Sequence, residues 1–99
     1  MARPFITPAD QADVFRAVAH RWRRVLLERL MEQPANVSDL HRQLPITMAT
    51  LSSHLRILRE AGLVKARRSG HSLIYHPQLG RLEAIRRWLT LAEKASKQK

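Results

Sequence analysis

The stretch TMATLSSHLRILREAGLV, residues 47–64, constrains the fold more than any other part of the chain. Leu51, Leu55 and Leu58 recur at helical spacing and predict a buried stripe, whereas the positions between them are mostly polar or cationic. Gly62 can adopt the left-handed conformation that ends a helix. The stretch therefore predicts a helix with one face turned to a core and another face available to a partner.

A shorter helix is predicted directly before this one. The segment VSDLHRQL places Leu40 and Leu44 on one stripe, and either Asn36 or Ser38 can cap its first turn. A proline then ends this helix, and Thr47 is expected to cap the helix that follows. The pattern is that of two short helices joined by a tight turn.

Helices are also predicted toward both ends of the chain. Thr7 suits an N-cap, and apolar residues then recur at helical spacing to about residue 31. This region fits either one long helix or two helices kinked near His20. A last helix with an apolar stripe is expected from about Leu79 to residue 95.

Between these helices, the period of the sequence changes from helical to alternating. The segment VKARRSGHSLIYH predicts a β-hairpin folded about the turn-forming pair Ser69-Gly70. With those two residues as the loop, Ala66 is expected to pair with Leu73.

Charge and composition narrow the choice of partner. Eighteen Lys and Arg against eight Asp and Glu leave a formal charge of +10, which favours a polyanionic partner. The chain has no cysteine, which excludes disulfides and thiolate metal sites. Its apolar runs are too short to span a membrane, and its start lacks the apolar core of a secretory signal. We expect a cytoplasmic, nucleoid-associated protein of one domain, residues 1–99, with no enzymatic activity and no cofactor.

The predicted elements form a mainly α winged helix-turn-helix fold, of about five helices and a two-stranded β-hairpin. The helix-turn-helix is expected at residues 37–62, and the hairpin, or wing, at residues 63–76. A helix about 10–12 Å wide fits the major groove of DNA, which is about 12 Å across. We therefore expect the polar helix face and the basic wing tip to contact double-stranded DNA. The expected contact residues are Thr47, Met48, Thr50, Ser52, Ser53, His54, Arg56, Arg67, Arg68 and His71.

Two residues of this set have alternative roles. His54 adjoins the buried position Leu55, so its ring can hydrogen-bond within the domain in place of contacting DNA. Arg56 lies farther along the helix, where it can neutralise a phosphate or pair with Glu60.

The segment VSDLHRQLPITMATLSSHLRILREAGLVKARRSGHSLIY resembles the core of ArsR-type winged helix-turn-helix repressors. That family's pattern runs V-S-E-L, then S-x-H-L-x-x-L-x-x-A-G-L-V, then a basic wing, and FRAVAHRWRRVLLERL is similar to its upstream segment. The resemblance implies a homodimeric repressor that binds an inverted-repeat operator. It also implies dimerisation through helices at about residues 8–31 and 79–95. The expected interface residues are Phe15, Val18, Trp22, Leu82, Ile85, Trp88 and Leu89.

The sequence also departs from the family pattern. His20-Arg21-Trp22 stands where the family has Asp-Pro-Thr, so the proline break between its first two helices is missing. The segment EQPANVSDL replaces the cysteine-containing segment of arsenic and cadmium sensors, and the last helix lacks the His and acidic pattern of zinc and nickel sensors. We therefore assign no metal ligands. An unknown small-molecule inducer at the dimer interface, or no inducer, both remain open.

Other functions also fit the sequence. An architectural protein that tolerates any DNA sequence, or a module that holds an acidic partner protein, would carry the same basic charge. A His-based metal-responsive repressor is a third alternative, with its metal site shared across a dimer, because the histidines lie on different predicted elements.

Overall fold

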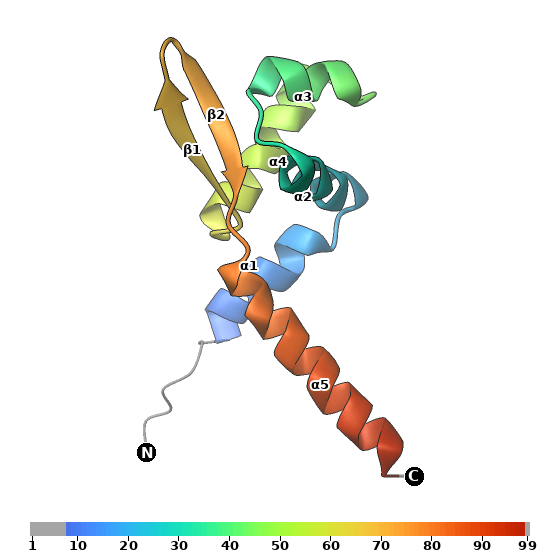
Figure 1. Ribbon diagram of the computed structural model, residues 1–99. Helices are drawn as coiled ribbons and strands as arrows, with labels where there is room; N and C mark the ends of the chain where they lie inside the picture. The colour runs from blue at the N-terminus through green and yellow to red at the C-terminus, as the bar shows by residue number, and fades with distance from the viewer. Residues whose placement is uncertain (1–7, 99) are drawn as a thin grey trace.

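The structure is a computed structural model that describes residues 8–98 (Figure 1), so the expected N-cap Thr7 lies outside the described residues. Five α-helices, one short 3₁₀ helix and one two-stranded antiparallel sheet make up this part of the chain, which confirms the predicted fold class. In chain order the elements are α1 (Pro8–Val18), α2 (Arg21–Glu32), α3 (Val37–Gln43), α4 (Met48–Glu60), β1 (Val64–Ser69), β2 (Ser72–Pro77), η1 (Gly80–Leu82) and α5 (Glu83–Lys97).

The first helical region is two helices and not one. The chain breaks between α1 and α2 at Ala19 and His20, although no proline is present there. His20 acts as the N-cap of α2, since its Nδ1 atom accepts a hydrogen bond from the backbone N–H of Trp22 at 3.1 Å. A side-chain cap therefore supports the helix start that proline supports in the family pattern.

The core is built mainly of leucines from α2, α3 and α4. The stripe predicted for α4 is confirmed, since Leu51, Leu55 and Leu58 are at most 2% exposed. Leu40 of α3 and Leu44, which directly follows that helix, are also buried in the same cluster. These apolar contacts fix α4 with its polar face outward.

The ends of the two helices of the helix-turn-helix are fixed by side-chain and backbone caps. Asn36, one of the two alternatives for α3, accepts from the amide of Asp39 at 2.8 Å. Thr47 accepts from the amide of Thr50 at 3.1 Å, as predicted for the start of α4.

At the other end of α4 the chain turns through Gly62, which has a φ of +76°. The amide of Leu63 donates to the carbonyl of Leu58 at 2.9 Å, which closes a Schellman-type cap. The side chain of Arg81 crosses directly over Gly62, so that a Cβ atom there would lie 2.6 Å from Arg81 Nε. Gly62 is thus favoured by its conformation, and a Cβ atom there would also displace the side chain of Arg81.

The predicted hairpin is present, but its predicted turn is wrong by one residue. Ser69 pairs with Ser72, so the loop is Gly70-His71 and not Ser69-Gly70, and Ala66 pairs with Tyr75 and not with Leu73. Gly70 has a φ of +63°, and a positive φ at the first position of a two-residue loop is what a type II′ turn requires.

The base of this hairpin, which we call the wing, is tied to the rest of the fold. Ala35, in the linker between α2 and α3, exchanges two backbone hydrogen bonds with Tyr75 of β2, at 2.8 and 3.2 Å. The amide of Gln78 donates to the carbonyl of Leu63 at 2.7 Å. These bonds hold the wing at a fixed position beside α4.

The last helix, α5, extends away from the helix-turn-helix (Figure 1). It packs against α1, where the rings of Phe15 and Trp88 meet edge to face with centroids 5.9 Å apart. Trp88, Leu89 and Leu91 nevertheless remain 57%, 50% and 65% exposed. None of the described helices is long and apolar enough to cross a membrane.

Candidate nucleic-acid interface

The polar side of α4 lies on the surface of the molecule. The wing tip and the α3–α4 end of the fold point in the same direction, while α1 and α5 lie at the other end (Figure 1). Nine of the ten residues expected to contact DNA are exposed: Thr47, Met48, Thr50, Ser52, Ser53, Arg56, Arg67, Arg68 and His71.

Thr47 and Thr50 form one hydrogen-bonded unit at the start of α4. The hydroxyl of Thr47 donates to Oγ1 of Thr50 at 2.9 Å while it accepts from the Thr50 amide. The hydroxyl hydrogen of Thr47 is thus already engaged, whereas that of Thr50 is free to be donated to another group. Thr47 therefore positions the helix start, and Thr50 is the better base-contact candidate.

Arg56 forms an ion pair with Glu60, which was one of the two roles predicted for it from the sequence. Its Nη1 atom lies 3.6 Å from Oε2 of Glu60, one helical turn away, and both side chains are largely exposed. Exposed pairs of this kind contribute little to stability, so Arg56 can exchange Glu60 for a phosphate at small cost.

His54 is the exception among the expected contacts, because it is buried and makes the contact within the domain that the sequence allowed as an alternative. It is only 7% exposed, because its side chain lies on the buried side of α4 with the leucine stripe. Its ring packs against that of His20, with centroids 4.4 Å apart, and its Nδ1 atom lies 3.3 Å from Nη1 of Arg23. Burial lowers the pKa of His54, and His20 and Arg23 lower it further.

Arg23 is a structural residue that the sequence reasoning missed. It is 8% exposed, and it donates to the carbonyl of Ala17 at 2.7 Å and to that of Arg16 at 3.0 Å, which fastens the end of α1 to α2. Burial lowers the pKa of Arg23, with a smaller contribution from Arg16. Its spacing from Leu26 and Leu30 was the available signal, because that spacing places Arg23 on the buried stripe of α2.

Metal ligands do not converge in the part of the chain that the structure describes. No group of three or more His, Asp or Glu side chains lies close enough together there to hold an ion. His20 and His54 do meet, although the sequence placed them on separate elements. The guanidinium of Arg23 lies beside His54, and this positive charge disfavours a bound metal ion.

The residues expected at a dimer interface divide into two groups. Val18, Trp22 and Leu82 pack against the core of their own chain, and Phe15 contacts Trp88 within the chain. Trp88 and Leu89 stay exposed, whereas Ile85 is half-buried.

Comparisons with known proteins give a consistent result. The family model described as bacterial regulatory protein, arsR family, matches residues 22–66. The uncharacterized HTH-type transcriptional regulator Rv0081 of Mycobacterium tuberculosis is 36% identical over 81 residues, which covers 78% of this chain and 71% of the relative. The biofilm growth-associated repressor of Xylella fastidiosa is 32% identical over 80 residues, which covers 74% and 70%.

Solved structures share the whole arrangement. The crystal structure of Rv0081 superposes with a TM-score of 0.68 at 29% identity and covers 95% of this chain and 100% of that chain. A crystal structure of an ArsR family transcriptional regulator reaches a TM-score of 0.83 at 23% identity, with 100% and 99% covered. At that identity, the second likeness shows the fold alone.

A helix-turn-helix with an exposed polar second helix and a basic hairpin beside it defines a winged helix-turn-helix protein. The sequence relatives then place this protein more narrowly. The chain belongs to the ArsR family of bacterial regulatory proteins, so it is a DNA-binding regulator of transcription and not an enzyme.

Proposed function

We propose that this protein is a homodimeric repressor that binds an inverted-repeat operator in a sequence-specific manner. The observation that carries the proposal is that the polar face of α4 and the basic wing tip are exposed at one end of a single DNA-binding domain. The names of relatives support repression, since one is a biofilm growth-associated repressor. Such a protein acts in the cytoplasm, on DNA of the nucleoid.

In this proposal, α4 enters the major groove and reads bases. Thr50, Ser52 and Ser53 present hydroxyls that both donate and accept, and Met48, 40% exposed, offers an apolar contact to a thymine methyl group. Arg56 neutralises a phosphate after exchanging Glu60.

The wing supplies the second contact. Arg67, Arg68 and His71 are exposed near the hairpin turn, where they reach an adjacent minor groove or the phosphate backbone. The hydrogen bonds between Ala35 and Tyr75 fix the base of the wing and therefore its direction.

Dimerisation is proposed through α1 and α5. The exposed Trp88, Leu89 and Leu91 form an apolar surface on α5, which a second copy of the chain covers. A two-fold axis between the copies then presents two α4 helices to one side of a duplex, about 34–36 Å apart, as an inverted repeat requires. No cofactor is part of the proposal.

Selection of bound fragments from genomic DNA tests this function. We expect one recurring inverted repeat and a clear preference for it over random duplex at moderate salt. Binding of all fragments with equal affinity and a steep salt dependence would favour the architectural alternative, and retention of an acidic protein without DNA affinity would favour the interaction module.

A pair of variants tests base reading by α4. The double variant Ser52→Ala, Ser53→Ala is expected to weaken binding to the selected repeat about tenfold and binding to random duplex much less. Ser96→Ala, an exposed serine in α5, is the matched control. Equal losses on both DNAs would contradict base contact by these serines.

A further inference from the structure

A groove separates α4 from the wing, and its lining combines apolar and cationic groups. It has a volume of about 580 Å³ and is lined by Val37, Ser52, Leu55, Arg56, Arg59, Glu60 and Tyr75. This volume lies within the range of about 300–1,000 Å³ that small-molecule sites occupy.

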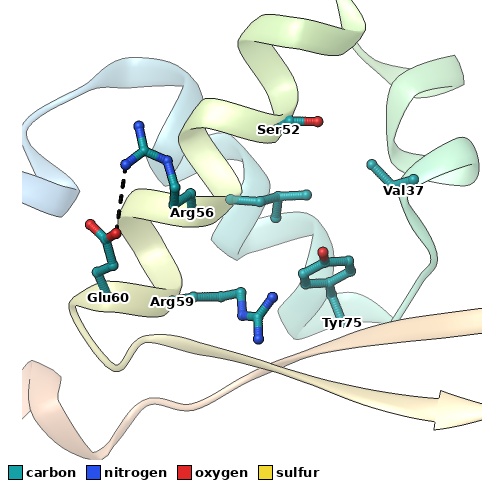
Figure 2. A pocket seen from close by; sticks show the side chains of 7 residues that line it. Val37, Ser52, Arg56, Arg59, Glu60 and Tyr75 are labelled. Atoms are coloured by element: carbon teal, nitrogen blue, oxygen red, sulfur yellow. Dashed lines mark ion pairs between the residues drawn. The ribbon is translucent and has the colours of Figure 1, made fainter.

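Arg59 and Ser52 contribute polar groups at two places along the groove. In Figure 2, the guanidinium of Arg59 extends from α4 toward Tyr75, whereas the hydroxyl of Ser52 points toward the side of Val37. Arg56 points away from Tyr75 and is paired with Glu60. Among residues 13–98, whose side chains the structure describes, no carboxylate forms an ion pair with Arg59, so its charge is available to an anion.

The remaining walls are apolar. Val37 and the ring of Tyr75 are half-buried on the side of α3 and the wing, and Leu55 closes the bottom. A phosphodiester backbone presents mainly charged phosphate oxygens and little apolar surface to these walls. A flat hydrocarbon body presents apolar surface, and it would gain free energy by removing these walls from water.

The walls of the groove formed by Val37 and Tyr75 are held together by backbone hydrogen bonds. Tyr75 is bonded to Ala35 through both its amide and its carbonyl, and Ala35 directly precedes the cap of α3. The spacing between these two walls is thus set before any ligand arrives, and a preformed site avoids the cost of ordering.

We propose that this groove binds a small aryl carboxylate, with the carboxylate on Arg59 and the ring between Val37 and Tyr75. Ser52 belongs both to the groove and to the proposed DNA-reading face, so the bound anion competes with DNA. This last consequence rests on the proposed function, whereas binding of the anion does not.

The test uses the full chain and the probe 2-naphthoate, followed by amide NMR spectra. We expect shifts concentrated at Val37, Ser52, Arg59 and Tyr75 and, because an exposed charge pair contributes up to about 1 kcal/mol, about fivefold weaker binding of the neutral analogue 2-naphthylmethanol. Shifts centred on Trp88 and Leu89, or equal affinity for the two probes, would overturn the proposal.

Two matched variants isolate the contribution of the Arg59 charge to naphthoate binding. Arg59→Gln is expected to remove the preference for naphthoate over the alcohol, while Arg29→Gln, the same change at an exposed site on α2, keeps it. The amide spectrum without probe shows whether each variant is folded. If Arg59→Gln weakens duplex binding and leaves naphthoate affinity unchanged, the groove serves the DNA backbone and the proposal is wrong.

A competition experiment separates this proposal from the proposed function. Naphthoate is expected to raise the apparent Kd for duplex DNA in the wild type and not in Arg59→Gln. If the protein binds naphthoate but shows no preference among DNA sequences, the proposed ligand site stands and the proposed sequence-specific repressor is wrong. If the protein binds an operator but does not bind naphthoate, the proposed repressor stands and the proposed ligand site is wrong.

Discussion

Nδ1 of His54 lies 3.3 Å from Nη1 of Arg23, and this contact joins α4 to α2 inside the fold. A guanidinium only donates, so Nδ1 accepts, and the proton of the neutral ring is on Nε2. That Nε2 atom is buried and has no hydrogen-bond partner among the described residues. Protonation of Nδ1 would remove the acceptor and place a second cation beside Arg23.

The first prediction is a loss of stability in mild acid. Because the pKa of His54 is lowered in the folded protein, the unfolded chain binds more protons below its ordinary value of 6.5. The contribution of His54 to the free energy of unfolding is therefore constant above about pH 6.5. This contribution falls as the pH drops from about 6.5 through the folded-state pKa of His54. Urea unfolding followed between pH 7.5 and 5 measures the change.

The variant His54→Gln separates this effect from other titrations. Its absolute stability differs from that of the wild type, so the comparison concerns only the slope with pH. We expect a smaller slope in the variant, in which the neighbours His20 and Arg23 are unchanged. Identical slopes in the two proteins would contradict a role for His54.

A second prediction concerns the two glycines with positive φ. Gly70→Ala is expected to cost about 1 kcal/mol, since its φ of +63° disfavours an L side chain although the space around it is open. Gly62→Ala is expected to cost more, about 2 kcal/mol, because the new methyl group also displaces Arg81. Urea midpoints measure both.

The contribution of Arg81 can be isolated by a third variant. In an Arg81→Ala background, we expect Gly62→Ala to cost about as much as Gly70→Ala does in the wild type. If Gly62→Ala destabilises the protein equally in that background, the contact with Arg81 does not contribute to the loss of stability.

The third prediction tests the proposed dimer. Trp88→Glu places a charge in the centre of the exposed apolar surface of α5 and is expected to weaken self-association at least tenfold. Leu73→Glu is the matched control, because Leu73 is 40% exposed on β2, outside the proposed interface. Sedimentation equilibrium measures the association, and equal behaviour of the two variants would argue against dimerisation through α5.

The fourth prediction concerns the wing. Arg67→Ala and Arg68→Ala are each expected to reduce the slope of log K against log salt by about 1 and to weaken all duplexes to a similar extent. Arg29→Ala on α2 should leave the slope unchanged. A wing substitution that changed the preferred sequence without changing the slope would indicate base readout by the wing.

The sequence predicted the parts of the fold that depend on neighbours along the chain. Helical periodicity identified the leucine stripe of α4, and cap chemistry placed its start at Thr47. The break at His20 was one of two alternatives, because a histidine cap has no strong signature in a single sequence. The register of the wing depended on whether Gly70 takes the first or the second position of the loop, and local pattern allows both.

The burial of His54 depends on a different kind of interaction. His54 lies three residues after Leu51 and four before Leu58, so periodicity alone already placed it on the buried stripe. Its polarity argued for the surface, and its partner Arg23 comes from another helix. A buried polar pair of this kind depends on long-range packing, which a local pattern does not contain.

The backbone bridge between Ala35 and Tyr75 also determines where the chain can vary in length. One residue inserted between α2 and α3 would slide Ala35 out of register with Tyr75 and carry α3 with it. An insertion at Gly70-His71 would only extend the hairpin outward, since nothing lies within 4 Å of a side chain added at Gly70. We therefore expect proteins built on this frame to differ in the reach of the hairpin and to keep the α2–α3 spacing constant.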